Sequence, residues 1–245
     1  MIESTENKKI KQIKKLNTQT KFRKKEKQFI VENKQSILDI IAKNTKLIDY
    51  VVVTDSHSEI KTAAKKKQVN LYICNQACAK YMSSVKVPMG CFAVIQQPEL
   101  TIIKQRSSLV IALYQIKSPA NCGAIIRNAH AFGCDAIYLL GDCCDPFHPE
   151  SIRAAAGNIT NIPIIDNVGL NQLSSYQCWK LDINASIPLN DVPKEERVCF
   201  ILGSESGFGD NALQEIKSCY IPMKHQTDSL NVAATSAIAL YNYMR

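Results

Sequence analysis

Short apolar runs alternate with amphipathic segments along most of the 245 residues of the chain. In the first hundred residues, three isoleucines within 37–41 recur at helical spacing, and YVVVT at 50–54 is typical of a buried strand. Two more strands and two more helices are predicted to follow, with the strands at 70–74 and 91–96 and the helices at 60–68 and 76–82. This pattern predicts a small α/β unit, and the sequence QPE at 97–99 marks its end.

The second part of the chain, from residue 107 onward, also alternates strand and helix. Strands are predicted at 109–116, 136–140, 162–165, 198–202 and 220–223, and helices at 123–132, 151–156, 212–217 and 230–243. Alternation of this kind favours a mainly parallel sheet that helices cover on both faces. Ligands bind beyond the carboxyl ends of such strands, so chemistry is expected in the loops there.

The composition is that of an ordinary globular protein, with 46% hydrophobic and 21% charged residues. No apolar run approaches the ~18 residues of a membrane-spanning helix, and the N-terminus lacks the apolar stretch of a signal peptide. We therefore expect a cytoplasmic protein, or an organellar one, with no membrane partner. The ten cysteines include no C-x-x-C pair and no Cys/His cluster at zinc spacing, so we expect reduced thiols, mostly in the core, and no metal site.

The net charge of +8 is concentrated at the start of the chain. Residues 1–30 carry ten lysines and arginines against three glutamates, a local balance of +7, so the rest of the chain is nearly neutral. A polyanion such as RNA attracts a cluster of this kind through counterion release. We therefore expect a basic N-terminal arm over residues 1–27 that contacts RNA; the alternative is a solvated charged helix without a partner.

Three loops at the predicted strand ends carry polar residues among small ones. In the first, Pro119 ends a strand, Asn121 is placed to cap the next helix, and Arg127 follows within two turns. The second, LGSESGFG at 202–209, holds Glu205 among residues small enough for a ligand to approach the backbone. The third, at 221–234, places the pair Asp228-Ser229 as a cap before a helix rich in small residues.

Each loop alone has an ordinary structural explanation. Capping explains Asn121, surface exposure explains Arg127, and a tight turn explains the second loop. The second loop is not the G-x-G-x-x-G of a dinucleotide site, and the Lys-Ser/Thr of a P-loop does not follow it. A nicotinamide-dependent oxidoreductase is therefore disfavoured.

Together and in this order, the loops resemble the three motifs of the SpoU (TrmH-like) branch of the SPOUT methyltransferases. The matched stretches are N-x-G-A-I-I-R-x-A-x-A-F-G at 121–133, R-A-A-A-G at 153–157, L-G-S-E at 202–205 and I-P-M-x5-S-L-N-V at 221–232. The resemblance covers about residues 107–245. Residues 29–32 resemble the start of the substrate-binding domain, similar to a ribosomal-protein fold, that precedes many such enzymes.

The resemblance implies an α/β fold with a parallel-sheet methyltransferase domain at 107–245 that contains a deep trefoil knot. A smaller N-terminal α/β domain at 28–100 is expected to bind the RNA substrate, after the basic arm at 1–27. The family further implies S-adenosyl-L-methionine as methyl donor and a homodimer. The acceptor it implies is a ribose 2′-hydroxyl of ribosomal or transfer RNA, with rRNA favoured.

By motif position, the resemblance assigns an active-site role to Asn121, Arg127, Glu205, Ser229 and Asn231. The backbone around five other residues is expected to hold the donor, namely Leu202, Gly203, Ile221, Met223 and Leu230. Methyl transfer to a hydroxyl requires an in-line approach and stabilisation of the developing alkoxide. Because a guanidinium is a poor proton acceptor, we assign Arg127 to electrostatic activation and phosphate binding and leave the proton acceptor open.

The chain departs from the family pattern at three positions near the expected donor pocket. Ser206 and Phe208 stand where the second motif usually has glycine, and His225 does so in the third motif. A second hypothesis is therefore a non-catalytic RNA-binding or ribosome-assembly protein that retains the methyltransferase fold. Binding of S-adenosylmethionine separates the two, because a collapsed pocket would not bind it.

Overall fold

The computed structural model describes residues 1–99, 108–204, 207–209, 213–225 and 229–245. The chain forms two compact units. The N-terminal unit comprises Met1–Pro98 and Asp145–Thr160, and the C-terminal unit comprises Glu99–Cys144 and Asn161–Arg245. None of the described helices combines the length and apolar character that crossing a lipid bilayer requires.

The N-terminal unit is built on a four-stranded sheet with the order β1-β4-β2-β3. β4 pairs antiparallel with β1 and β2, whereas β2 and β3 are parallel. Its strands are β1 (Gln28–Val31), β2 (Ile48–Val53), β3 (Leu71–Ile73) and β4 (Cys91–Gln96). Its helices are α1 (Lys8–Thr18), α2 (Thr20–Glu26), α3 (Lys34–Lys43), α4 (Ser58–Lys66), α5 (Gln76–Met82) and α7 (Pro149–Ala155), with the 3-10 turns η1 (Thr45–Leu47) and η2 (Asn158–Thr160).

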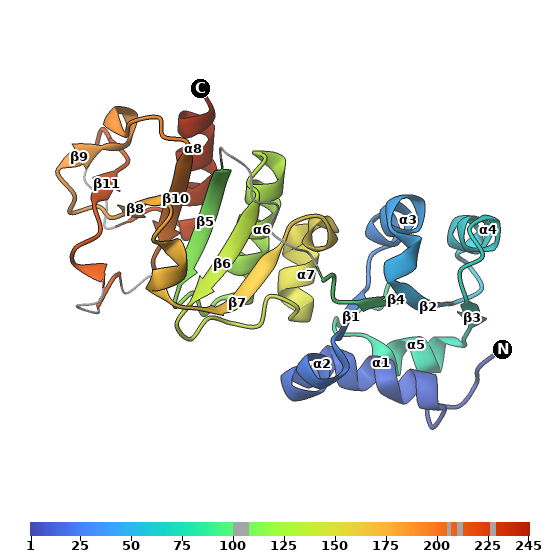
Figure 1. Cartoon of the computed structure of the whole chain (residues 1–245). Helices are drawn as coiled ribbons and strands as arrows, with labels where there is room; N and C mark the ends of the chain where they lie inside the picture. The colour runs from blue at the N-terminus through green and yellow to red at the C-terminus, as the bar shows by residue number, and fades with distance from the viewer. Residues whose placement is uncertain (100–107, 205–206, 210–212, 226–228) are drawn as a thin grey trace. The chain divides into compact units, whose positions relative to one another are not determined.

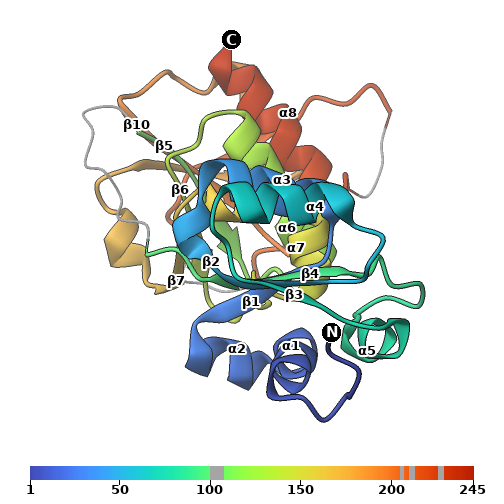
Figure 2. The ribbon, with the colours of Figure 1, turned by 90° about the vertical axis from the view of Figure 1, so that its right-hand side faces the viewer.

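Helices cover both faces of this sheet, with α3 and α4 on one face and α1 and α5 on the other (Figure 2). Ile10, Ile13 and Leu16, at helical spacing on α1, are fully buried in a cluster that includes the strand residues Val52 and Val94. The expectation of a separate arm at 1–27 was wrong, because burial of this apolar stripe holds α1 on the sheet.

A buried ion pair joins α2 to residue 145 within the same unit. Arg23 is only 1% exposed, and its Nε lies 2.8 Å from Oδ2 of Asp145. The other guanidinium nitrogens donate to oxygen atoms of α1 and α2. Nearby, the ring of Phe147 packs on Phe29 of β1, with centroids 5.0 Å apart. Arg23 is thus a structural residue, although the sequence places it in the basic segment expected to contact RNA.

The R-A-A-A-G stretch ends α7 with two residues of positive φ, Ala156 at 50° and Gly157 at 85°. A Cβ on Gly157 would lie 3.3 Å from the side chain of Ser36 on α3, so glycine lets the chain pass close to that helix. Residues 145–160 therefore pack in the N-terminal unit, whereas the family resemblance places them in the methyltransferase domain.

The C-terminal unit contains a seven-stranded sheet with the order β7-β6-β5-β10-β8-β11-β9 (Figure 1). Each of its strand pairs is parallel, which confirms the predicted sheet type. The strands are β5 (Ser108–Tyr114), β6 (Ala136–Leu140), β7 (Ile164–Val168), β8 (Gln177–Leu181), β9 (Ile187–Pro188), β10 (Arg197–Leu202) and β11 (Ser218–Tyr220). Its described helices are α6 (Pro119–Ala131) and α8 (Val232–Met244), with the 3-10 turns η3 (Leu170–Leu173) and η4 (Leu189–Asp191).

The two faces of this sheet are covered differently. α6 and α8 pack against each other on one face, whereas Leu173 of η3 and the loop residues Tyr176 and Leu213 contribute to the core on the other. Helices were expected on both faces, and among the described residues the second face carries the 3-10 turn η3 but no α-helix; within the expected helix 212–217, residues 214 and 215 form a turn. β8 lies outside the strands predicted from sequence, because Gln177 and Lys180 interrupt its apolar pattern.

Candidate active site

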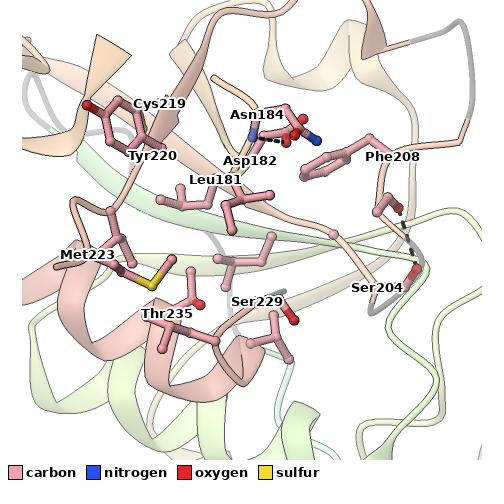
Figure 3. A pocket seen from close by; sticks show the side chains of 17 residues that line it. Leu181, Asp182, Asn184, Ser204, Phe208, Cys219, Tyr220, Met223, Ser229 and Thr235 are labelled. Carbon is pink, nitrogen blue, oxygen red and sulfur yellow. Dashed lines mark hydrogen bonds between the residues drawn. The ribbon is translucent and has the colours of Figure 1, made fainter. Parts of the chain in front are cut away.

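A cavity of about 370 Å³ lies at the carboxyl ends of β8, β10 and β11, beside the start of α8 (Figure 3). Parallel α/β sheets bind their ligands at this edge, and the volume lies in the usual range of small-molecule sites, roughly 300–1,000 Å³. The described lining residues are Leu181, Asp182, Ile183, Asn184, Leu202, Gly203, Ser204, Gly207, Phe208, Cys219, Tyr220, Ile221, Met223, Ser229, Leu230, Val232 and Thr235.

All five residues expected to hold the methyl donor line this first cavity. They are Leu202 and Gly203 at the end of β10, Ile221 and Met223 after β11, and Leu230 before α8. Ser229, expected in the active site, lines it as well. The parallel pairing of β10 with β8 and of β8 with β11 explains the convergence, because the carboxyl ends of parallel neighbours meet at one edge.

Asn121 and Asn231, from the first and third motifs, are joined by a hydrogen bond. Nδ2 of Asn231 donates to Oδ1 of Asn121 at 3.1 Å, and Oδ1 of Asn231 accepts from the first turn of α8. Asn231 is therefore the N-cap of α8, and the expected cap at Ser229 was wrong; Asp228 lies outside the described residues. The expected cap at Asn121 was also wrong, because Ser118 caps α6 at its N-terminus.

A second cavity, of about 400 Å³, adjoins the first. Its described lining residues are Gln115, Ile116, Lys117, Ser118, Asn121, Ser204 and Val232. Ser204 and Val232 line both cavities. Lys117 is the one cation of this described lining, and it forms an exposed ion pair with Asp142. The asparagine pair thus connects the second cavity to the N-terminus of α8, which borders the first.

The other two predicted active-site residues, Arg127 and Glu205, are not among the described lining residues of either cavity. Arg127 lies on α6, is exposed, and lines neither cavity. Glu205 lies outside the described residues, so the expected position of its carboxylate is untested. The structure brings together the first and third motifs and the start of the second.

Phe208, which stands where the family has glycine, forms part of the cavity wall. A Cβ on Gly203 would lie 2.9 Å from the Phe208 ring, so the ring packs directly over this glycine. The ring stacks on Tyr114 with centroids 5.9 Å apart, and Nζ of Lys180 lies 5.6 Å from its centroid. Phe208 is therefore anchored on the sheet, and the cavity stays open despite this departure from the family pattern.

Sequence reasoning missed Asp182 and Asn184, which line the first cavity after β8. The signal that points to them is their place just beyond the carboxyl end of a parallel strand, but β8 itself was not predicted. Seven of the ten cysteines are buried, which confirms the expectation that they lie mostly in the core. Within the described residues, no group of three or more His, Cys, Asp or Glu side chains is arranged to hold a metal ion.

The fold and the cavity define an α/β domain with a cavity of small-molecule size beyond the ends of its parallel strands. Residues 108–241 match the SpoU rRNA Methylase family, and residues 7–93 match the MRM3-like substrate binding domain. The chain therefore belongs to the SpoU rRNA methylase family. This membership confirms the resemblance found in the motifs.

Named relatives are similar along much or all of the chain. The 23S rRNA (guanosine(2553)-2'-O)-methyltransferase RlmP of Bacillus subtilis is 28% identical over 98% of this chain and 98% of its own length. The 23S rRNA (adenosine(1067)-2'-O)-methyltransferase of Streptomyces azureus is 28% identical over 57% of this chain and 55% of its own length. The AdoMet-bound rRNA methyltransferase of Sinorhizobium meliloti has the same fold, with a TM-score of 0.84 at 23% identity over 99% of this chain and 96% of that one.

Proposed function

We propose that this protein transfers the methyl group of S-adenosyl-L-methionine to a ribose 2′-hydroxyl of ribosomal RNA. The observation that carries this proposal is the Asn121–Asn231 hydrogen bond, which joins the second cavity to the helix that borders the first. Family membership and the 2'-O-methyltransferase names of the relatives in B. subtilis and S. azureus support it.

We place the methyl donor in the first cavity. Its size suits an adenosyl ligand, and Gly203 leaves backbone accessible beside the Phe208 ring. Leu202, Ile221, Met223 and Leu230 supply the apolar part of the wall. S-adenosylmethionine, when bound there, supplies an electrophilic methyl group on a cationic sulfur.

We place the acceptor nucleotide in the second cavity, beside Asn121 and Ser118. The amide of Asn121 is held by Asn231, so it is oriented before RNA binds. The exposed guanidinium of Arg127 is accessible to a phosphate, and its fixed positive charge favours a developing alkoxide nearby. We assign Ser229 and Glu205 to the same active site by motif, with Glu205 orienting its cationic or amide neighbours.

Titration calorimetry with S-adenosylmethionine and mapping of 2′-O-methylation in rRNA test this function together. The wild-type protein is expected to bind the donor and to restore methylation in cells that lack its gene. Arg127→Ala is expected to bind the donor normally and to lower turnover by a factor on the order of a hundred or more. His130→Ala, another exposed side chain on α6, is the control and should keep near-normal turnover.

The second candidate function is RNA binding without catalysis, and the departures at Phe208 and His225 favour it. The open first cavity argues against a collapsed donor site. A wild-type protein that binds rRNA but neither S-adenosylmethionine nor its analogues would establish this second function and overturn the first.

We further propose that the N-terminal unit binds rRNA and that two copies associate through α8. The unit matches a substrate-binding domain, and exposed lysines lie on its α2. On α8, Ile238, Tyr241 and Met244 are 39%, 54% and 60% exposed, which leaves apolar surface uncovered in the single chain. The trefoil knot remains an expectation from the family. We expect the protein to act where its rRNA substrate is found, in the cytoplasm or in an organelle.

Sedimentation equilibrium at micromolar concentration tests the dimer. A species of twice the 27.3 kDa chain mass is expected, and Tyr241→Glu should convert it to the single chain. A wild-type protein that sediments as a single chain at these concentrations would contradict the proposal.

A further inference from the structure

The first cavity contains a single ionised side chain among its described lining residues, the carboxylate of Asp182. The rest of the described lining is apolar, amide, hydroxyl, thiol or glycine. Burial raises the pKa of the Cys219 thiol to about 12, so this neighbour stays neutral at physiological pH. The described wall of the cavity therefore carries one negative charge and no positive charge.

Backbone hydrogen bonds hold Asp182 in place at this wall. Its N–H donates to the carbonyl of Cys219 at 3.0 Å, which ties the end of β8 to β11. Its Oδ1 accepts from the N–H of Asn184 at 2.9 Å, and Figure 3 shows this bond beside the cavity. No ion pair joins Asp182 to a lysine or arginine among the described residues. The carboxylate is thus held in place by backbone hydrogen bonds and forms no ion pair in the described part of the chain.

We propose that Asp182 is a specificity-determining residue that favours the cationic methyl donor over the neutral product in the first cavity. This inference rests on the proposed function, because it takes that cavity as the donor site. S-adenosylmethionine carries a zwitterionic amino acid and a sulfonium, for a net charge of +1. S-adenosylhomocysteine lacks the sulfonium charge and is neutral overall. One carboxylate in a partly enclosed cavity therefore attracts the donor more strongly than the product, which also helps the product to leave.

The test compares the affinities of three ligands by titration calorimetry with the full chain. The ligands are S-adenosylmethionine, S-adenosylhomocysteine, and sinefungin, which carries an amine in place of the sulfonium. The variant is Asp182→Asn, whose amide oxygen can still accept the bond from Asn184 and so preserves the turn. The matched control is Asp191→Asn, which removes an exposed carboxylate of η4 outside the cavity lining.

Asp182→Asn is expected to weaken binding of S-adenosylmethionine and sinefungin by about tenfold and to leave S-adenosylhomocysteine within about twofold of wild type. Asp191→Asn should leave all three affinities unchanged. Asp182→Glu keeps the charge and should restore most of the preference for the cationic ligands. The preference of the wild-type protein for S-adenosylmethionine over S-adenosylhomocysteine should also decrease as the salt concentration is raised.

Two results would overturn this inference. Equal losses of affinity for all three ligands in Asp182→Asn would mean that Asp182 contacts a chemical group that the three ligands share. Unchanged affinities would mean that the charge of Asp182 does not affect ligand binding. In both cases the wild-type protein still binds the donor, so the proposed function stands. A wild-type protein that binds none of the three ligands overturns the proposed function together with this inference.

Discussion

The side chain of Asn231 takes part in two kinds of interaction that a single substitution can separate. Its Oδ1 caps α8 by accepting from the N–H groups of Ala233 and Ala234, at 2.9 and 3.3 Å. Its Nδ2 donates to Oδ1 of Asn121. Asparagine supplies both an acceptor and a donor, and neither aspartate nor alanine supplies both.

Asn231→Asp is therefore expected to keep the cap and to remove the hydrogen bond to Asn121. The free energy of unfolding should remain within about 0.5 kcal/mol of the wild-type value, because aspartate is as good an N-cap as asparagine. Turnover should fall by a factor on the order of ten to a thousand, since Asn121 loses the hydrogen bond from Asn231 that helps to orient it. The measurements are calorimetric unfolding and the rate of rRNA methylation at saturating donor.

Asn231→Ala serves as the paired comparison, because it removes both interactions. It should lose about 1 kcal/mol of stability in addition to the same decrease in turnover. Normal turnover in Asn231→Asp would show that the asparagine pair does not orient the acceptor site.

At the scale of elements, the buried pair of Arg23 and Asp145 ties the segment just before α7 to α2 within the N-terminal unit. The two side chains are 2% and 7% exposed, so neither charge is solvated by bulk water. Removing one partner of a buried pair leaves the other charge uncompensated, which costs more than the pair itself contributes.

Arg23→Met is expected to lower the free energy of unfolding by about 3–5 kcal/mol. Lys25→Met, an exposed neighbour on α2, should stay within about 0.5 kcal/mol of wild type. The double variant Arg23→Met/Asp145→Asn should recover part of the stability, because it removes both charges. Denaturant unfolding measures all three, and a small effect of Arg23→Met would show that residues 145–148 are held mainly by apolar packing.

The start of α7 is expected to be sensitive to pH. His148 is its N-cap, and Nδ1 accepts from the N–H of Glu150 at 3.3 Å, which requires the neutral ring. Burial, aided by the charge of Arg23, lowers the pKa of His148 below its ordinary value of 6.5. The folded protein thus favours neutral His148, so this stabilisation is present above pH 6.5 and is lost as the pH falls through the lower pKa of the folded state.

Hydrogen exchange of the α7 amides at about pH 7.5 and 5.5, on either side of the ordinary histidine pKa, tests this sensitivity after correction for the intrinsic rates. Protection should decrease at the lower pH by no more than about 1 kcal/mol, the usual contribution of an N-cap. His148→Asn keeps a cap without a titrating ring, so its protection should be the same at both pH values. Equal pH dependence in wild type and variant would assign the effect to another group.

At the scale of the whole molecule, the basic N-terminal segment is both a structural layer and the candidate RNA surface. Deleting residues 1–27 would remove Ile10, Ile13 and Leu16 from the core and is expected to unfold the N-terminal unit. A truncated protein therefore cannot show whether this segment binds RNA. Substituting its exposed lysines with neutral residues can show it, because the N-terminal unit stays folded.

The triple variant Lys21→Gln/Lys24→Gln/Lys25→Gln on α2 should weaken rRNA binding and leave donor affinity unchanged. The slope of log affinity against log salt should become shallower by about 0.7–0.9 for each phosphate that the variant no longer neutralises. The control removes the same charge at the exposed lysines 65–67, at the end of α4 and just after it, and should have a smaller effect on affinity and slope. Equal effects from the two triplets would mean that the unit acts through its overall charge.

The sequence by itself determined the parallel sheet and most of the first cavity. Apolar runs mark buried strands wherever they stand, and motif residues directly after strands converge because parallel strands end at one edge. The family resemblance assigned Leu202, Gly203, Ile221 and Met223 to the donor site, and the shared edge of the parallel strands explains why all four line the cavity.

Only the tertiary structure decided which charges are structural and which residues share a unit. Arg23 looks like its lysine neighbours in the sequence, and its burial depends on Asp145, which is 122 positions away. Asp182 reaches the cavity because β8 pairs between β10 and β11, and no pattern in the nearby sequence predicts that pairing. Hydrophobic periodicity reports which face of an element is buried, whereas a polar side chain's role depends on partners that only the folded chain brings near.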